Sequence, residues 1–219
     1  MPVRIGIIDY GMGNLKSVYK AFRFLKTNPI FINKEEDFDC DGFVLPGVGA
    51  FEDGMRNLTP FIKVLKKEVE TKPILGICLG MQMLFSDSEE NGFFKGLNLI
   101  PGSVRKLPDG LKVPHMGWNS IEFLSDDPIL TEIKNGSYFY FVHSYIPFCN
   151  LNYSLGETEY GIKFPSIVAK ESIYGTQFHP EKSGESGLKL LRNYMHIVED
   201  TLWKFYLLLT YLIGTVSNL

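Results

Sequence analysis

A chain of 219 residues fits one α/β domain with a sizeable core. Its formal net charge is −3 and it contains no basic block, which argues against a nucleic-acid-binding protein. The three cysteines, Cys40, Cys78 and Cys149, are odd in number and far apart, which favours a reducing, cytoplasmic compartment over a disulfide scaffold or a zinc site.

The first part of the chain alternates predicted strands and helices. An apolar run at residues 4–8 predicts a strand so close to the N-terminus that we expect no signal peptide. Apolar residues at helical spacing predict helices over 14–26 and 60–70, and short apolar runs predict strands over 29–32 and 42–45. The alternation predicts an α/β fold, flavodoxin-like, with a mostly parallel sheet flanked by helices and an active site beyond the carboxyl ends of its strands.

A cysteine between two glycines follows the next apolar run. Gly76-Ile77-Cys78-Leu79-Gly80 is typical of a nucleophile on a sharp strand-to-helix turn, the cysteine counterpart of the Gly-x-Ser-x-Gly elbow. The glycines lack a Cβ, so the two arms of the turn can approach closely. The partial positive charge of a helix N-terminus favours a thiolate at this place. Taken alone, the motif is equally compatible with a buried cysteine at an ordinary turn.

The pattern changes after residue 99. Strand-like runs follow one another with few helix signals, at residues 120–123, 138–142, 166–169 and 174–178. They predict an antiparallel extension beside the parallel sheet, within the same domain. A closing helix is expected over 185–198, which ends a domain spanning residues 1–198.

An apolar extension occupies residues 199–219. About a dozen apolar positions, interrupted by Lys204, are too few for a membrane span, which needs ~20. Three interpretations remain open: an extra packed helix, an oligomer contact, or an anchor at a membrane surface. A packed helix is the first expectation, because apolar surface of this density is rarely left in water.

A candidate base lies about one hundred residues after the cysteine, in the segment Gly175–Ser183. A thiol nucleophile needs a base within reach, and the base needs a third group to orient it. His179 and Glu181 are two residues apart, so both project from one side of an extended segment. The order Cys78…His179-x-Glu181 resembles the class I glutamine amidotransferases, in which a Cys-His-Glu triad attacks the side-chain amide of L-glutamine and releases ammonia through a thioester.

Further motifs narrow the resemblance. They are Ile7–Leu15, Leu45–Phe51 with Gly54-Met55, His115-Met116-Gly117-Trp118-Asn119, and Tyr140–Tyr145. Together they look like the glutaminase subunit of imidazole glycerol phosphate synthase, and the match covers residues 5 to 196. The resemblance implies a heterodimer with a barrel-type cyclase subunit, which uses the ammonia to make imidazole glycerol phosphate and AICAR in histidine biosynthesis. No cyclase sequence is present, so a separate partner is required.

The resemblance also assigns residues around the nucleophile. Acyl transfer passes through an oxyanion, which needs two N–H donors. The Leu79 N–H is one, as in other elbows, and Val48 is implied as the other, through a peptide that flips to form the hole. The residues implied to hold glutamine are Gly49, Gln82, His143, Ser144 and Tyr145. Gln82 lies one helical turn after the cysteine, where a solvated side chain is the alternative.

The face implied to dock on the cyclase contains Asn14, Trp118, Asn119 and Lys182. For Trp118 a place in the buried core is an equally good interpretation. His115 is expected to be structural.

Other functions are weaker. Gly11-Met12-Gly13 after a strand suggests a dinucleotide site, but Lys16 stands where the fingerprint needs a third glycine, so we expect neither a cofactor nor a metal ion. A related glutaminase that serves a sugar amidotransferase would use the same chemistry with another acceptor. A non-catalytic regulatory protein is disfavoured because every triad position is filled, and a cysteine peptidase because of the glutamine-pocket pattern.

Overall fold

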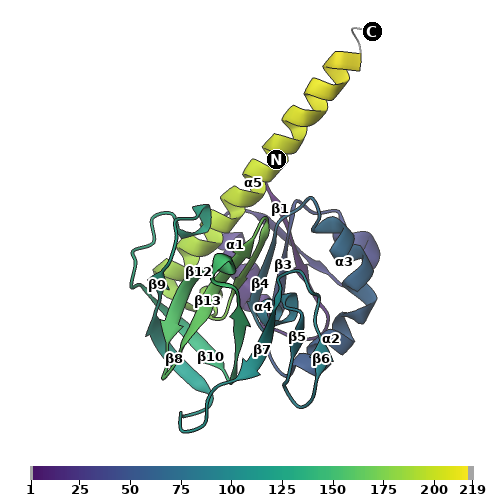
Figure 1. The fold of residues 1–219 in the computed structure, drawn as a ribbon. Coiled ribbons are helices and arrows are strands. Elements are labelled where there is room, and N and C mark those ends of the chain that lie inside the picture. Colours follow the sequence, from purple (N-terminus) through teal and green to yellow (C-terminus); the bar gives the residue numbers. More distant parts are fainter. Residues whose placement is uncertain (1, 217–219) are drawn as a thin grey trace.

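The computed structural model describes residues 2–216, with side chains up to residue 207 (Figure 1). An eight-stranded sheet runs through the molecule in the order β2-β1-β3-β4-β14-β13-β12-β9. The strands are β1 (Arg4–Ile8), β2 (Asn28–Ile32), β3 (Gly42–Gly47), β4 (Ile74–Cys78), β9 (Glu122–Phe123), β12 (Ser154–Glu159), β13 (Lys163–Lys170) and β14 (Ile173–Thr176). The first five strands in this order, β2, β1, β3, β4 and β14, pair in parallel. The last three, β13, β12 and β9, continue the sheet with antiparallel pairing. The predicted α/β fold with an antiparallel extension is confirmed. The strand predicted over 174–178 was assigned wrongly to that extension, because β14 pairs parallel with β4 and belongs to the parallel part of the sheet.

Two small sheets stand beside the large one. In the first, β8 (His115–Ser120) pairs with β10 (Tyr138–His143). The second is made of β5 (Asp87–Ser88), β6 (Phe94–Lys95), β7 (Gly102–Lys106) and β11 (Tyr145–Cys149). The strand predicted over 120–123 is divided, because β8 ends at Ser120 and β9 begins at Glu122.

Five α-helices are described: α1 (Leu15–Phe24), α2 (Phe51–Leu58), α3 (Ile62–Glu68), α4 (Leu79–Leu84) and α5 (Gly184–Val216). The helix predicted over 60–70 is a 3₁₀ turn at Thr59–Phe61 followed by α3. Helix α2 was not predicted, since Gly54 near its middle lowers helix propensity. Close packing against α4 accounts for a glycine at this position, because a Cβ at Gly54 would lie 2.8 Å from the sulfur of Met83.

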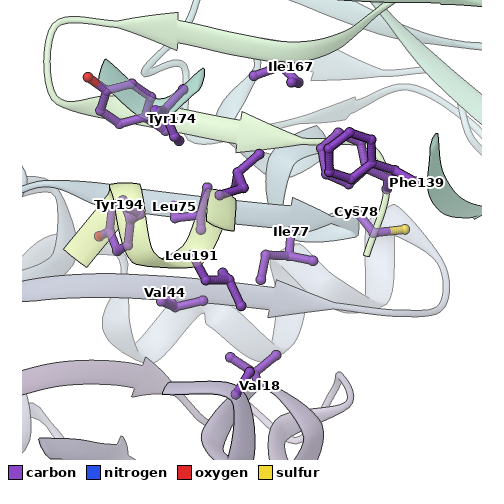
Figure 2. Close-up of a cluster of buried hydrophobic side chains, with 14 of the residues drawn as sticks. Val18, Val44, Leu75, Ile77, Cys78, Phe139, Ile167, Tyr174, Leu191 and Tyr194 are labelled. Atoms are coloured by element: carbon purple, nitrogen blue, oxygen red, sulfur yellow. The ribbon is translucent and has the colours of Figure 1, made fainter. Parts of the chain in front are cut away.

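The core is divided into two clusters of buried apolar side chains. Figure 2 shows part of one cluster, in which Val44 and Leu75 of the parallel strands lie near Leu191 and Tyr194 of α5. The hydroxyl of Tyr194 donates to the carbonyl oxygens of Phe43 (2.6 Å) and Pro73 (3.0 Å). The first half of α5 is therefore fastened to the sheet by both apolar packing and hydrogen bonds.

The closing helix does not end near residue 198 but continues to Val216. Its last part projects away from the body of the molecule (Figure 1). Trp203, Phe205, Tyr206 and Leu207 are 53–68% exposed, so the expectation of an extra packed helix is wrong for them. Residues 217–219 of the extension lie outside the described residues. Within the described residues, no helix combines the length and apolar character that crossing a membrane requires.

Candidate active site

Cys78 stands at the junction of β4 and α4, as the elbow motif predicts. It is the last residue of the strand and the N-cap of the helix, with φ 55° and ψ −111°, and it is 7% exposed. A Cβ at Gly80 would lie only 1.7 Å from the carbonyl oxygen of Leu45 on β3. Glycine at this position therefore lets α4 start directly against the neighbouring strand.

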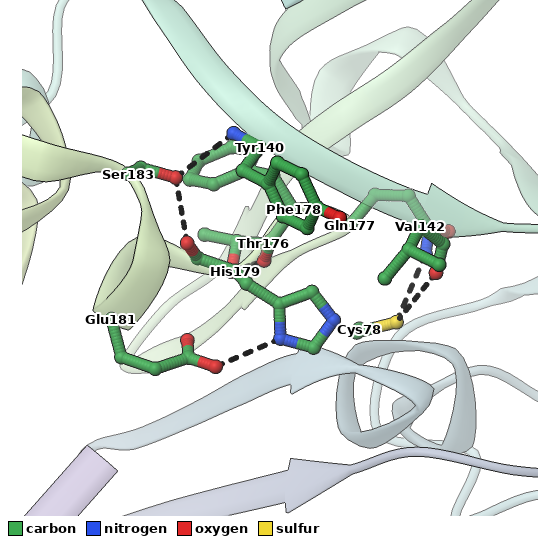
Figure 3. A network of polar contacts seen from close by, with 9 residues as sticks. All are labelled: Cys78, Tyr140, Val142, Thr176, Gln177, Phe178, His179, Glu181 and Ser183. Atoms are coloured by element: carbon green, nitrogen blue, oxygen red, sulfur yellow. Dashed lines mark hydrogen bonds and ion pairs between the residues drawn. The ribbon is translucent and has the colours of Figure 1, made fainter. Parts of the chain in front are cut away.

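His179 lies beside this cysteine because β14 is the parallel neighbour of β4. Figure 3 shows the imidazole between Glu181 and Cys78. Its Nδ1 is 2.9 Å from Oε1 of Glu181, and the two side chains are 2% and 1% exposed. Its Nε2 is buried without a hydrogen-bond acceptor among the described residues and faces the sulfur. The three residues predicted to act together are thus close in space.

The charge state of His179 follows from these neighbours. Burial disfavours its charged form, but the electrostatic interactions with the neighbouring Cys78 and Glu181, and the hydrogen bond to Glu181, outweigh burial and raise the pKa of His179 to about 10. The arrangement therefore favours a protonated imidazole at neutral pH.

Backbone contacts fix the loop that carries His179. Its N–H donates to the carbonyl oxygen of Tyr140 on β10 (2.9 Å). Ser183 Oγ donates to the carbonyl oxygen of His179 (2.6 Å) and accepts from the N–H of Tyr140 (3.0 Å; Figure 3). The role of Ser183 in this anchorage was not predicted, because it depends on a strand that is distant in sequence.

The sulfur of Cys78 has two long polar contacts. It lies 3.7 Å from the carbonyl oxygen of Val142 and 3.9 Å from Nε2 of Gln177 (Figure 3). Gln177 is fully buried. It belongs to the segment that contains His179, yet its contact with Cys78 was not predicted.

A pocket of about 350 Å³ opens in front of the cysteine. Its lining residues are Val48, Gly49, Cys78, Leu79, Gln82, Glu90, Pro114, Val142, His143, Ser144 and Tyr145. All the residues implied to form the oxyanion hole and to hold glutamine are therefore at this pocket. Glu90 supplies the only carboxylate of the lining and was missed in the sequence. Burial raises its pKa, against the lowering effect of the Phe51 N–H, which donates to it at 2.8 Å.

Gln82 and His143 are buried and hydrogen-bonded at the pocket. Gln82 is buried, and its Nε2 donates to the carbonyl oxygen of Tyr145 (3.0 Å) and to Oε1 of Gln177 (3.1 Å), so a solvated side chain is wrong. His143 has Nδ1 at 2.9 Å from the Tyr145 carbonyl oxygen and Nε2 at 3.0 Å from Nδ1 of His115. Because both ring nitrogens are engaged, the imidazole of His143 offers neither to a ligand in the pocket.

The residues implied at the partner face differ in exposure. Trp118 is 55% exposed on β8, with its ring centroid 6.2 Å from that of Tyr140, so a place in the core is wrong. Met116 and Tyr138 are also exposed on the β8–β10 pair. Asn14 and Asn119 are partly buried and Lys182 is exposed.

Comparisons with known proteins identify the family of the chain. The family model of class I glutamine amidotransferases matches residues 6–198. The chain is 49% identical over 195 residues to the imidazole glycerol phosphate synthase subunit HisH of Methanocaldococcus jannaschii, covering 89% of this chain and 100% of that protein. It is 48% identical over 200 residues to the subunit of the same name from Caldanaerobacter subterraneus, covering 89% of this chain and 98% of that protein.

Solved structures share the fold at lower identity. A glutamine amidotransferase from Thermotoga maritima has a TM-score of 0.61 at 18% identity, covering 94% of this chain and 86% of that one. PurLQS from Thermotoga maritima has a TM-score of 0.72 at 17% identity, covering 90% of this chain and 100% of the matched chain. Residues 199–219 lie beyond the family match.

Proposed function

Because the chain belongs to the class I glutamine amidotransferase family, we propose that Cys78, His179 and Glu181 hydrolyse glutamine for a separate cyclase subunit. Within that family the chain belongs to the HisH subunits of imidazole glycerol phosphate synthase. The protein is a glutamine-hydrolysing subunit of histidine biosynthesis. The observation that carries the proposal is the buried His179–Glu181 pair, whose remaining imidazole nitrogen faces the sulfur at the pocket. The relatives' names favour a histidine-pathway cyclase over a sugar-modifying partner as the acceptor of ammonia.

In the first half of the reaction, the thiolate of Cys78 attacks the side-chain amide carbon of glutamine. The C–S bond forms and the carbonyl π electrons move to oxygen. Protonated His179 then gives its Nε2 proton to the amide nitrogen, the C–N bond breaks and ammonia leaves a thioester. The raised pKa of His179 supports this order, because the proton is already on the imidazole when attack begins.

In the second half, neutral His179 takes a proton from water as the water oxygen attacks the thioester carbon. The C–S bond breaks, glutamate leaves, and the imidazolium–thiolate pair is restored. Glu181 holds Nδ1 of His179, so the imidazole keeps the tautomer that exposes Nε2 to the reaction, and its carboxylate stabilises the imidazolium.

Two backbone N–H groups stabilise the oxyanion of both steps in this proposal. The N–H of Leu79 belongs to the first residue of α4, where helical N–H groups have no acceptor within the helix. The N–H of Val48 comes from the neighbouring turn, in which Gly49 has φ +105°. The Val48 N–H belongs to the Gly47–Val48 peptide, and Gly47 permits a rotation of that peptide toward the pocket at little cost.

The lining of the pocket suits the two ends of glutamine. Glu90 provides a carboxylate for the α-ammonium group, and its burial strengthens such a pairing because the local dielectric is low. Gln82 has given both amide hydrogens to protein acceptors, so it offers its Oε1 to ligand N–H groups. The side chains of Ser144 and Tyr145 and the backbone at Gly49 complete the proposed glutamine site.

The cyclase docks, in this proposal, on the face that carries Asn14, Trp118, Asn119 and Lys182. The exposed apolar side chains of Met116, Trp118 and Tyr138 support an interface there. The face adjoins the loop of His179, because Trp118 contacts Tyr140 and Tyr140 binds the His179 backbone.

The test is a glutaminase assay of the isolated chain, with and without the candidate cyclase and its nucleotide substrate. We expect slow hydrolysis by the isolated chain and acceleration of about 100–1000-fold in the loaded complex, the value of one oxyanion donor. Full activity of the isolated chain would refute the gated oxyanion hole. An absence of glutamine hydrolysis in the loaded complex would refute the function.

A further inference from the structure

One continuous chain of hydrogen bonds connects the surface of β8 to the sulfur of Cys78. We propose that this chain, called the relay below, positions the glutamine pocket and the nucleophile, and that His115, which does not line the pocket, is one of its positioning residues. The relay consists of Asn119, His115, His143, the carbonyl of Tyr145, Gln82, Gln177 and Cys78. The proposal rests on the proposed function, since it concerns the same reaction.

The first part of the relay crosses the β8–β10 pair, where His115 and His143 are register partners. Nδ2 of Asn119 lies 3.3 Å from Nε2 of His115. Nδ1 of His115 lies 3.0 Å from Nε2 of His143, and Nδ1 of His143 lies 2.9 Å from the carbonyl oxygen of Tyr145.

The second part runs through the pocket to the nucleophile. The Tyr145 carbonyl oxygen also accepts from Nε2 of Gln82 (3.0 Å). The same nitrogen donates to Oε1 of Gln177 (3.1 Å). Nε2 of Gln177 then lies 3.9 Å from the sulfur of Cys78, the end of the relay that is visible in Figure 3.

The donor and the acceptor of each hydrogen bond in the first part of the relay follow from the carbonyl oxygen of Tyr145 at its end. A carbonyl oxygen only accepts, so the proton of neutral His143 is on Nδ1 and its Nε2 is an acceptor. His115 must therefore donate from Nδ1, which leaves its Nε2 to accept from the amide of Asn119. This pattern requires both imidazoles to be neutral. Burial lowers the pKa of His143 to about 3 and that of His115 to about 4, which keeps them so at neutral pH.

Packing holds the imidazole of His115 in this orientation. Its ring stacks on Tyr160, with centroids 4.1 Å apart and planes at 20°, and on Phe141, with centroids 5.0 Å apart and planes at 24°. The amide of Asn119 is held by a second bond to the carbonyl oxygen of Glu159 (3.0 Å). A buried network in which every member has a partner fixes one arrangement of its side chains, and removal of one partner leaves others unsatisfied.

In this proposal His115 affects the reaction although it does not contact the substrate. His115 orients His143, and His143 binds the same carbonyl oxygen as Gln82, which lines the glutamine pocket. Loss of the His115 nitrogens should therefore disturb glutamine binding more than the ammonia-dependent reaction of the partner. Asn119, the partly buried end of the relay, adjoins Trp118 on the proposed docking face.

Two substitutions of His115 separate hydrogen bonding from packing. His115→Phe keeps an aromatic ring between Tyr160 and Phe141 but removes both nitrogens. His115→Asn keeps a donor near the position of Nδ1. The matched control is Tyr160→Phe, which keeps the stacked ring and removes only the hydroxyl, whose bond to the Lys112 carbonyl oxygen (2.8 Å) lies outside the relay.

Steady-state glutaminase kinetics are measured in the cyclase complex, together with ammonia-dependent synthesis and the thermal midpoint. We expect His115→Phe to lower kcat/KM for glutamine about 10-fold, mainly through KM, the effect of leaving a buried partner unsatisfied. His115→Asn should recover to within about 3-fold of the wild type, and Tyr160→Phe should stay within about 2-fold. Ammonia-dependent synthesis should be unchanged in all three.

Equal losses in His115→Phe and His115→Asn, or no loss in His115→Phe, would overturn the relay. If His115→Phe does not unfold cooperatively, Asn119→Ala replaces it, with the rate of Cys78 modification by 6-diazo-5-oxo-L-norleucine in the isolated full chain as readout. An unchanged rate in that variant would also overturn the relay. A wild-type complex without glutaminase activity would instead count against the proposed function.

Discussion

Ile77 and Thr176 are register partners in the parallel pair of strands β4 and β14. Cys78 follows Ile77 directly, and His179 follows Thr176 after two further residues. Because parallel neighbours end at the same edge of a sheet, this one register brings the thiol and the imidazole together. A shift of one residue would turn the side chains of β14 to the opposite face and separate the pair.

Cys78→Ser separates the source of ammonia from its use. A serine hydroxyl is not ionised beside His179, so glutamine-dependent synthesis by the complex should fall by at least about 1000-fold. The change is nearly isosteric, so folding and docking should persist, and added ammonium salt should restore synthesis. Steady-state assays with each nitrogen source measure both effects. A Cys78→Ser complex that still uses glutamine, or that assembles and ignores ammonia, would contradict the assignment.

His179 provides a pH test. Its pKa is raised to about 10, so its contribution to the free energy of unfolding is present below the unfolded value of ~6.5 and is lost as the pH rises through about 10. Cys78→Ala removes one of the two neighbours that raise the pKa of His179, so that pKa should then fall. Histidine NMR titration of both proteins measures it. An unchanged pKa would show that the sulfur does not stabilise the imidazolium.

Trp118→Ala should weaken cyclase binding. The exposed indole is the largest side chain of the proposed docking face, and an aromatic anchor at an interface contributes at least about 2 kcal/mol, or ~30-fold in Kd. Titration calorimetry with the cyclase measures the change, and a thermal scan checks the fold. Phe24→Ala is the matched control, since Phe24 is 71% exposed at the far end of α1. Equal effects of the two substitutions would move the interface elsewhere.

Truncation after Leu202 tests the division between domain and extension. The side chains described from residue 203 to 207 are exposed, so their removal gives up little buried apolar surface. We expect the thermal midpoint to stay within a few degrees of the full chain, and the glutaminase activity of the complex within about 2-fold. Calorimetry and steady-state kinetics measure both. A large loss of either would make the extension part of the catalytic domain.

The parts of the site that were predictable from the sequence depend on local signals. Glycines on both sides of Cys78 indicate a close turn. His179 and Glu181 are two residues apart, so their pairing could be predicted from one short segment. The mutual placement of these two segments was not predicted, because the strand over 174–178 was assigned to the antiparallel extension, whereas β14 pairs parallel with β4. The docking residues and the glutamine contacts came from resemblance, not from spacing.

What was missed depends on contacts between distant segments. Ser183 acts through the backbone of Tyr140, and Glu90 reaches the pocket from a loop without a motif of its own. The hydrogen bonds of His115 were not predictable, because its two partners, His143 and Asn119, meet it only when β8 and β10 pair. The length of α5 was also missed, although neither glycine nor proline interrupts residues 199–213.

The backbone conformation of Cys78 sets stability against activity at this position. With φ 55° and ψ −111°, the residue occupies a conformation that only glycine adopts without strain, at a cost on the order of 1–3 kcal/mol for other residues. Glycine at this position would relieve the strain and abolish the nucleophile in the same step. We therefore expect Cys78→Gly to be the more stable and inactive protein, so that only selection for activity would retain the cysteine. A duplicated gene copy freed from that selection would be expected to lose its thiol before it loses its fold.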